Sequence, residues 1–338
     1  MGAGGYSVRG KKAFPAIIDC DPGVDDALAL ALAVASPEMD LRAVTTVHGN
    51  IPARMAYRNA RRMVAFLHDN LKRPGLAPPV YAGAGKPIGR GRIDRTISYA
   101  IHGKDGLGDL FRRRESSLLE TNDDSRSSDQ VIAGLALEFG KALCVIAIGP
   151  LTNLALAIKR DRKALAGVGR IVVMGGAARM PGNVTPAAEF NVYCDPEAAE
   201  LVMNCGAPIT MIGLDVTRQA LLPSTSLKGG GPFRRALREL VRPYAGFSKS
   251  RRGVDGVTLH DPLAVAAAIE TGLVDTLRRK VSVECGGGPS RGMTVVDLRP
   301  EAGGSHKSAT GVDVALGVDA KRFLRFFLKR LGSYHGWV

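Results

Sequence analysis

The sequence predicts a single α/β domain with a mainly parallel, two-sided central sheet and an active site at the C-terminal edge of its strands. Two observations lead to this fold class. Short apolar runs typical of buried strands alternate with helical segments along most of the 338 residues, a pattern that favours a parallel sheet covered by helices on both faces. No internal repeat or convincing linker interrupts the alternation, so we expect one catalytic domain over residues 13–333.

The first predicted unit is a strand, a turn and a helix. The apolar run that includes Ile17 and Ile18 predicts a buried strand, and Pro22 with Gly23 predicts a turn. Asp25 then stands where the N-cap of the next helix is expected, at the positive end of the helix dipole. Polar residues of this unit should therefore lie at the carboxyl edge of the sheet, the usual ligand crevice of open α/β folds.

The later elements follow the same rhythm with two departures. Strands are expected over residues 41–47, 143–148, 170–174 and 207–213, and helices over residues 53–68, after residue 153 and from about residue 196. The Gly- and Arg-rich residues 81–129 predict long loops, and residues 221–259 predict an irregular helical segment. Residues 282–313 predict late β-structure and residues 321–331 a C-terminal helix, whereas the basic, Gly-rich residues 1–12 predict a disordered arm.

Composition narrows the functional classes. No apolar run is long enough to span a bilayer, and we expect no membrane partner and no signal peptide. The five cysteines show no paired metal-binding spacing, which favours a reduced, cytoplasmic protein. The net charge of +14 comes from short, dispersed basic groups without aromatic interleaving, so we do not expect nucleic acid as a partner.

Four carboxylates lie within eight positions of the first unit, at Asp19, Asp21, Asp25 and Asp26. Without compensation they would repel one another, and some would be forced to stay protonated. A hard cation is the simplest remedy, because such ions prefer oxygen ligands. The alternative is that one carboxylate caps the helix, one lies in the turn and the others are solvated. The number and spacing of the carboxylates favour a metal or catalytic site.

Further polar groups follow the other predicted strands. Asn50 follows the second strand, the backbone of Ile148 ends the third, and a polar loop occupies residues 182–191. Far downstream, His260 and Asp261 precede an apolar helix. Alone, that pair predicts an ordinary helix cap. Beside the acidic cluster, Asp261 becomes a candidate distant metal ligand.

Together these motifs resemble the nucleoside hydrolase family, the inosine-uridine-preferring nucleoside N-ribohydrolases. The resemblance extends from about residue 16 to residue 331, and the ordered set of motifs is highly specific. The matching stretches are Asp19-x-Asp21-x-x-x-Asp25-Asp26, residues 45–50, residues 101–108, residues 149–153, residues 173–176, residues 185–196, His260-Asp261-Pro262 and residues 292–297.

The resemblance implies a Ca²⁺ cofactor and a ribonucleoside substrate. By position, the calcium ligands would be Asp21, Asp26, Asp261 and the backbone carbonyl of Ile148, with the 2′- and 3′-hydroxyls of the substrate and one water. Asp21 would also take a proton from that water. The residues expected to hold the ribose are Asp25, Asn50, Met174, Asn183, Glu189 and Asn191, and those expected near the base are His102 and His260.

These residue types suit the chemistry. Cleavage of an N-glycosidic bond builds positive charge on the ribosyl group, which carboxylates and amide oxygens stabilise. A histidine is a suitable acid for the departing base near neutral pH, and we assign that role to His260. By this resemblance, His260 places the chain with the family members that use a histidine rather than a tryptophan near the base, which favours a broad or pyrimidine-accepting specificity. One departure concerns the base: Phe247 and Arg251 occupy places where broad-specificity relatives often carry tyrosines.

We therefore expect a Ca²⁺-dependent enzyme that converts a ribonucleoside and water into ribose and a free base, with Asp21 and His260 as catalytic residues. We also expect a homodimer or homotetramer. Two alternatives remain open at this point. One is a catalytically silent ribose- or nucleoside-binding protein on the same fold. The other is a Mg²⁺-dependent phosphotransferase with Asp19 or Asp21 as nucleophile.

Overall fold

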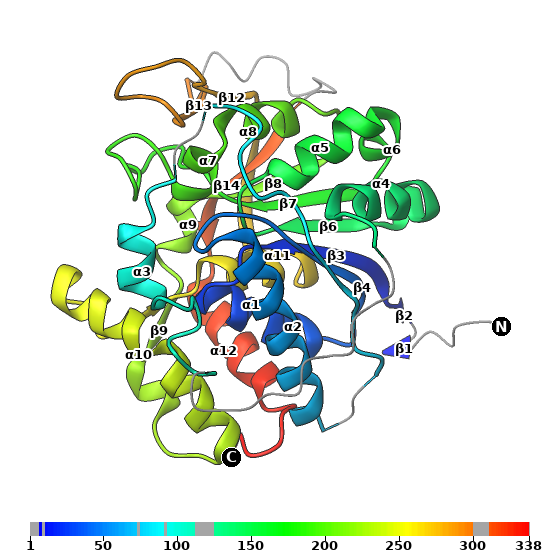
Figure 1. Ribbon diagram of the computed structural model, residues 1–338. Coiled ribbons are helices and arrows are strands. Elements are labelled where there is room, and N and C mark those ends of the chain that lie inside the picture. The colour runs from blue at the N-terminus through cyan, green and yellow to red at the C-terminus, as the bar shows by residue number, and fades with distance from the viewer. Residues whose placement is uncertain are drawn as a thin grey trace.

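The computed structural model describes residues 7–8, 11–72, 75–90, 93–111, 125–299 and 311–337. An eight-stranded sheet forms the centre of the protein (Figure 1). Its strands, in chain order, are β3 (Phe14–Cys20), β4 (Met39–Thr46), β5 (Val80–Tyr81), β6 (Cys144–Ala147), β7 (Arg170–Met174), β8 (Ile209–Ile212), β11 (Val274–Arg279) and β14 (Val312–Val318). Their spatial order is β11-β14-β8-β7-β6-β3-β4-β5. Every neighbouring pair is parallel except β11 with β14, so the predicted fold class is confirmed.

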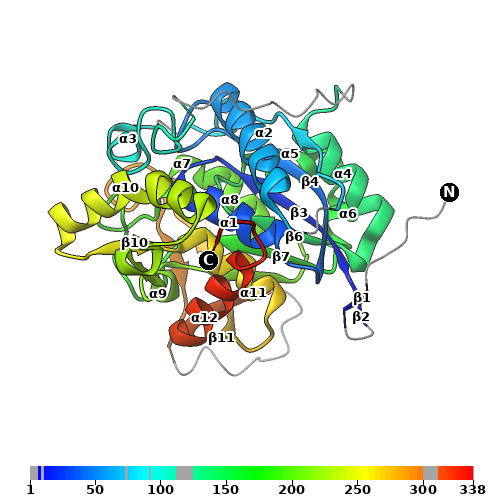
Figure 2. The same cartoon turned by 90° about the horizontal axis from the view of Figure 1, so that it is seen from below.

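Helices cover both faces of this sheet, as Figures 1 and 2 show. One layer contains α1 (Val24–Val34), α2 (Ala53–Asn70), α11 (His260–Ile269) and α12 (Ala320–Leu331). The opposite layer contains α4 (Ser128–Phe139), α5 (Thr152–Arg160), α6 (Arg162–Ala166) and α8 (Pro196–Met203). Each layer has its own buried apolar cluster against the sheet. The burial of both faces explains why the strands are apolar along their whole length rather than alternating.

The first strand-turn-helix unit lies at the middle of the molecule. Helix α1 is buried on all sides, which its run of Ala and Leu allows, and it packs against α11. We expected Asp25 at the N-cap, and this is wrong: Gly23 is the N-cap residue, in extended backbone. The carboxylate of Asp26 reaches back to accept the N–H of Gly23 at 2.8 Å. The carboxylate that completes the cap therefore comes from the first turn, because Gly23 has no side chain to supply it.

The irregular segments contain more regular structure than the sequence indicated. Within residues 81–129, α3 (Thr96–His102) forms a short helix, and residues 91–92 and 112–124 lie outside the described ranges. Within residues 221–259, the long helix α10 (Pro232–Arg252) is flanked by β9 (Leu221–Pro223) and β10 (Gly256–Thr258), which pair antiparallel. A 3₁₀ turn, Ser224–Leu227, links β9 to α10. Figure 1 shows the C-terminal end of α10 beside α3.

The remaining elements complete the sheet and its edges. Two short helices follow β7 and β8, namely α7 (Phe190–Cys194) and α9 (Leu214–Thr217). The predicted late β-structure includes a hairpin of β12 (Val281–Val283) and β13 (Thr294–Val296), while residues 300–310 lie outside the described ranges. In the N-terminal stretch expected to be a disordered arm, the described residues form β1 (Ser7–Val8) and β2 (Lys11–Lys12), paired antiparallel.

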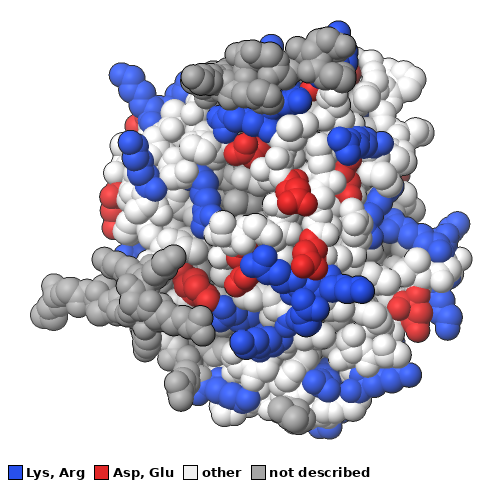
Figure 3. Space-filling view, turned by 180° about the vertical axis from the view of Figure 1, so that it is seen from behind, with Lys and Arg blue, Asp and Glu red and all other residues white. Residues whose placement is uncertain are grey.

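The surface agrees with the dispersed charge pattern of the sequence. On the face shown in Figure 3, Lys and Arg side chains form separate groups with acidic and uncharged side chains between them. All five cysteines are free thiols. Within the described ranges, no helix is both long and apolar enough to cross a membrane.

Candidate active site

The carboxyl ends of four parallel strands open into one cavity of about 510 Å³. Because β3, β4, β6 and β7 run in the same direction, the segments that follow them meet at one edge of the sheet. The cavity is lined by ten of the residues proposed from the sequence, which are Asp25, Asn50, His102, Ile148, Met174, Asn183, Glu189, Asn191, His260 and Asp261. The two remaining site residues, Asp21 and Asp26, are fully buried beside it.

Three carboxylates come together at this cavity: Asp25 and Asp261 line it, and Asp26 is buried beside them. Oxygen atoms of Asp25, Asp26 and Asp261 all lie within 4.8 Å of one another, a spacing that could hold a metal ion. Burial raises the pKa of Asp25 to about 8 and that of Asp26 to about 6. Burial and the neighbouring carboxylates raise the pKa of Asp261 well above its ordinary value. Without a cation, the cluster therefore holds protons that isolated carboxylates would release.

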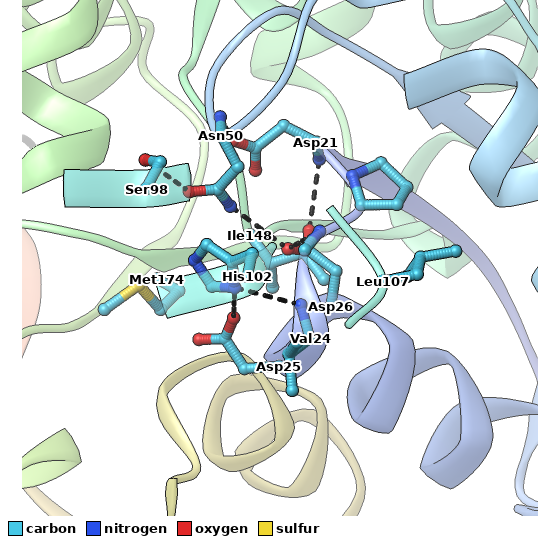
Figure 4. Close-up of polar contacts among 12 residues, drawn as sticks. Asp21, Val24, Asp25, Asp26, Asn50, Ser98, His102, Leu107, Ile148 and Met174 are labelled. Atoms are coloured by element: carbon cyan, nitrogen blue, oxygen red, sulfur yellow. Dashed lines mark hydrogen bonds and ion pairs between the residues drawn. The ribbon is translucent and has the colours of Figure 1, made fainter. Parts of the chain in front are cut away.

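Asp21 lies next to this cluster with one oxygen fixed and one free (Figure 4). Its Oδ2 accepts the backbone N–H of Asn50 at 2.6 Å. Its Oδ1 is buried and has no hydrogen-bond partner among the described residues. Backbone surrounds the carboxylate closely: a Cβ on Gly49 would lie 2.0 Å from Oδ2, and one on Gly149 would lie 2.7 Å from Oδ1. An orphaned buried oxygen is costly unless a ligand or ion satisfies it.

Asp19, the first carboxylate of the motif, makes hydrogen bonds beneath the site rather than lining the cavity. Its Oδ1 accepts hydrogen bonds from Thr45 Oγ1 at 2.6 Å and from Asn153 Nδ2 at 2.8 Å. Burial raises the pKa of Asp19 to about 7. The side chain does not line the cavity, so Asp19 ties β3 to β4 and α5 rather than facing a ligand.

His102 is held as a neutral imidazole. Its Nδ1 accepts the backbone N–H of Val24 at 3.1 Å, which leaves the ring proton on Nε2 (Figure 4). Burial lowers the pKa of His102 to about 3. The same Nδ1 lies 3.9 Å from Oδ1 of Asp25. His102 can thus offer one N–H to a ligand but carries no charge near neutral pH.

His260 occupies the first position of α11, next to the Asp261 carboxylate. Its Nδ1 lies 2.8 Å from the hydroxyl of Thr217. Burial, with help from the charges of Arg252 and Arg218, lowers the pKa of His260 to about 3. A proton donor at this position would therefore act from a small protonated fraction near pH 7.

The loop after β7 brings three polar residues to the cavity wall. Asn191 donates from Nδ2 to the carbonyls of Ile148 at 3.0 Å and Met174 at 3.1 Å. Glu189 accepts backbone N–H groups from Gly176 and Asn191 and caps α7. Asn183 accepts the N–H of Phe190 at 2.9 Å, which pins the exposed end of the loop.

Sequence reasoning missed the part of the wall that comes from α3 and the residues before it. Asp94, Thr96, Ile97 and Ser98 line the cavity, and Ser98 donates to the side-chain oxygen of Asn50 at 3.3 Å. No periodic or motif signal marks this segment, which the sequence predicted to be loop. Its contact with α10 is what brings it to the site.

Comparison with known proteins agrees with this geometry. Residues 16–325 match the family described as inosine-uridine preferring nucleoside hydrolase. The pyrimidine-specific ribonucleoside hydrolase RihA of Salmonella agona is 37% identical, and the match covers 95% of this chain and 99% of that protein. The relative of the same name from Klebsiella pneumoniae is also 37% identical over the same shares of both chains.

Solved structures give the same result. The purine-preferring ribonucleoside hydrolase from Gardnerella vaginalis is 35% identical with a TM-score of 0.83, over 94% of this chain and 98% of that one. The plant nucleoside hydrolase PpNRh1 is 31% identical with a TM-score of 0.82, over the same shares. The chain belongs to the inosine-uridine preferring nucleoside hydrolase family. Its activity is hydrolysis of ribonucleosides to ribose and a free base.

Proposed function

We propose that the protein is a Ca²⁺-dependent ribonucleoside hydrolase in which Asp21 is the general base. The observation that carries the proposal is the partnerless Oδ1 of Asp21 beside the buried carboxylate cluster. Carboxylates so close together, and so deeply buried, are compatible when a cation lies among them. The family assignment favours this hydrolase over the phosphotransferase alternative. A measurement of turnover distinguishes the hydrolase from a catalytically silent binding protein.

The donor set fits a hard cation. Asp21, Asp26, Asp261 and the carbonyl of Ile148 would supply only oxygen ligands, which Ca²⁺ prefers. Asp25 also lies within the close group of carboxylates, and we assign it to the ribose hydroxyls. When bound, Ca²⁺ would neutralise the cluster and lower the pKa of the attacking water.

The side chains then divide the work of hydrolysis. Asn50 fixes one oxygen of Asp21 through its backbone N–H, so the free oxygen is oriented to accept a proton from water. Asp25 and the buried carboxylates near it stabilise the positive charge that develops on the ribosyl group. The other proposed ribose ligands are Asn50, Met174, Asn183, Glu189 and Asn191.

His102 and His260 are the residues that we place beside the nucleobase of the substrate. His102 would donate its Nε2–H to the base while remaining neutral. We propose His260 as the proton donor to the departing base, supported by its place beside Asp261 on the cavity wall. The lowered pKa of His260 leaves a small protonated fraction near pH 7, and the rate of His260→Ala shows whether that fraction acts.

Base preference and assembly complete the proposal. RihA relatives are named for pyrimidine specificity, whereas the Gardnerella relative of similar identity is named for purine preference. Overall sequence identity therefore does not distinguish pyrimidine specificity from purine preference. We propose a broad or pyrimidine-accepting enzyme. We further propose that it acts in the cytoplasm as a homodimer or homotetramer.

A reducing-sugar assay over uridine, cytidine, inosine, adenosine and guanosine tests the proposal. The full chain with Ca²⁺ should release ribose from at least the pyrimidine nucleosides, and Asp21→Asn should not. Binding of nucleosides without release of ribose by the unmodified chain would support the silent binding protein instead.

A further inference from the structure

Two arginines at the C-terminal end of α10 line the active-site cavity. Arg251 and Arg252 share that wall with Tyr244 and Phe247 from the preceding turns of the helix. Tyr244, Phe247 and Arg251 follow one another at intervals of three and four residues, which places them on one face of α10. In both ribbon views this end of α10 lies beside α3 (Figures 1 and 2). One wall of the cavity thus combines aromatic and cationic side chains.

The guanidinium groups of Arg251 and Arg252 are available to a ligand. Among the described residues, neither guanidinium has a hydrogen-bond or ion-pair partner. Other arginines of the same region are held: Arg218 donates to the carbonyl of Gly182 at 2.9 Å, and Arg238 of α10 donates to that of Leu227 at 3.0 Å. The donors of Arg251 and Arg252 are therefore free for a ligand.

Of the two arginines that line the cavity, Arg252 is the one whose charge acts on neighbouring titratable groups. Partial burial and then the charge of Arg252 lower the pKa of Arg218. The same charge acts to lower the pKa values of Tyr244 and His260, where burial is the largest cause of the shift. His260 adjoins Asp261 of the carboxylate cluster. The cavity thus has a negative pole at the carboxylates and a positive pole at Arg252. That polarity matches a bond that breaks into a positive sugar and a negative base.

The departing base carries negative charge that a cationic side chain can stabilise. When the C1′–N bond breaks, its electron pair stays on the base, and the charge spreads onto exocyclic carbonyl oxygens. Uracil and hypoxanthine carry such an oxygen at C4 and C6, where cytosine and adenine carry an amino group. A guanidinium offers only donors and a permanent charge, so it binds the oxygen well and the amino group badly.

We propose that Arg252, assisted by Arg251, is a leaving-group subsite that binds the carbonyl oxygen of the departing base. We place this oxygen at C4 of uracil and C6 of hypoxanthine, so the enzyme prefers these bases over cytosine and adenine, which carry an amino group there. The C2 oxygen that uracil and cytosine share does not distinguish them. The inference rests on the proposed function, because the arginines can act on a base only if the cavity binds a nucleoside.

The step balances with the groups already placed in the site. The oxygen of water forms the new bond to C1′, and the proton that this water loses passes to Asp21. The electron pair of the C1′–N bond leaves with the base. The guanidinium of Arg252 stabilises the negative charge that builds on the base, and the base takes its proton from His260, the donor proposed above.

The test is Arg252→Met in the full chain with Ca²⁺, with kcat and KM measured for uridine and cytidine. Removal of a group that stabilises transition-state charge costs roughly 10²–10³ in kcat, and we expect that loss for uridine. The loss for cytidine should be at least about tenfold smaller, since the amino group gains little from the arginine. Inosine and adenosine should show the same contrast.

Two further variants of this position separate charge from shape. Arg252→Lys keeps the charge but not the planar fork, and should recover part of the uridine rate. Arg252→Gln keeps a donor without the charge, and should behave like Arg252→Met. Arg242→Met is the matched control, because Arg242 is exposed on the same helix and does not line the cavity.

The outcomes separate the subsite from the proposed function. Equal losses for uridine and cytidine would overturn the subsite, because they indicate a positioning role for Arg252. A lower melting temperature with unchanged preference would also overturn it and leave the arginine as a favourable charge at the helix end. Failure of the unmodified enzyme to hydrolyse any ribonucleoside would contradict the proposed function instead.

Discussion

The backbone N–H of Asn50 donates a 2.6 Å hydrogen bond to Oδ2 of Asp21, and the other oxygen of Asp21 is left buried without a partner among the described residues. Asn50 follows β4 and Asp21 follows β3, so the contact depends on the parallel pairing of these two strands. It fixes the direction of the free oxygen, as a general base requires.

Replacing Asp21 by Asn tests this arrangement. The amide cannot accept a proton from water, and a general base typically contributes about 10²–10⁴ in rate. We expect a loss of at least that size in kcat for uridine and for p-nitrophenyl riboside alike, because both need the activated water. Asp161→Asn, at the N-cap of α6, is the control. A large loss for only one of the two substrates would contradict a role for Asp21 in activating water.

His260→Ala separates proton donation from positioning. p-Nitrophenolate departs readily as an anion, whereas the hypoxanthine anion is a poorer leaving group and departs more readily when it is protonated. If His260 donates a proton, kcat should fall by roughly 10²–10⁴ for inosine and far less for p-nitrophenyl riboside. His68→Ala, on α2, is the control. Equal losses would show that His260 positions the site, and no loss for either substrate would move the acid elsewhere.

The pKa values of the buried carboxylates predict how the metal-free protein responds to pH. Asp25 has a pKa of about 8 and Asp19 of about 7 when folded, both above their unfolded values. Between pH 6.5 and 8 the folded state therefore binds more protons than the unfolded state, and stability falls as pH rises. We expect a lower melting temperature at pH 8 than at pH 6.5 in chelated protein.

The same linkage predicts what Ca²⁺ does. Ligation requires ionised carboxylates, so binding at pH 7 should release protons and should remove the loss of stability towards pH 8. Calorimetry in two buffers of different ionisation enthalpy measures the protons released. Binding without proton release would contradict the raised pKa values. The buried histidines oppose this trend at the acidic end of the window. Burial lowers the pKa of His48 to about 4 and that of His102 to about 3, so the unfolded state binds more protons at these sites until the pH has passed their ordinary value of 6.5.

2′-Deoxynucleosides test how the ribose is held. They lack an oxygen that we expect the carboxylate cluster and its cation to bind. Sites built around a substrate hydroxyl reject analogues without it by factors on the order of 10⁴. We expect kcat/KM for 2′-deoxyuridine to be lower than that for uridine by about this factor. Similar values for the two would show that the 2′-hydroxyl is not bound in the site.

The sequence was a good guide to the strands and to the residues that follow them. Apolar runs such as β7 stand out because both faces of a parallel sheet are buried, and the polar residue after each strand must then lie at the sheet edge. The antiparallel strand β11 was not predicted, because its alternating, partly exposed pattern carries a weak signal.

Contacts between distant segments could not be predicted. Nothing local to Ser98 or Val24 indicates that they bond to Asn50 and His102. Gly23, and not the expected Asp25, is the N-cap residue of α1, and the Asp26 carboxylate accepts its backbone N–H. That hydrogen bond depends on the surrounding fold. The free guanidinium of Arg252 is likewise visible only once α10 has packed against α3.

The most direct test of the account is the rate of uridine hydrolysis by the full chain after exhaustive chelation, followed by titration with Ca²⁺. The buried carboxylates and the partnerless oxygen of Asp21 predict no ribose release above background in chelated protein. They also predict recovery of the full rate as Ca²⁺ is added, and a weakened Ca²⁺ response in Asp261→Ala. An undiminished rate in metal-free protein would contradict the assignment of this cluster as a catalytic metal site.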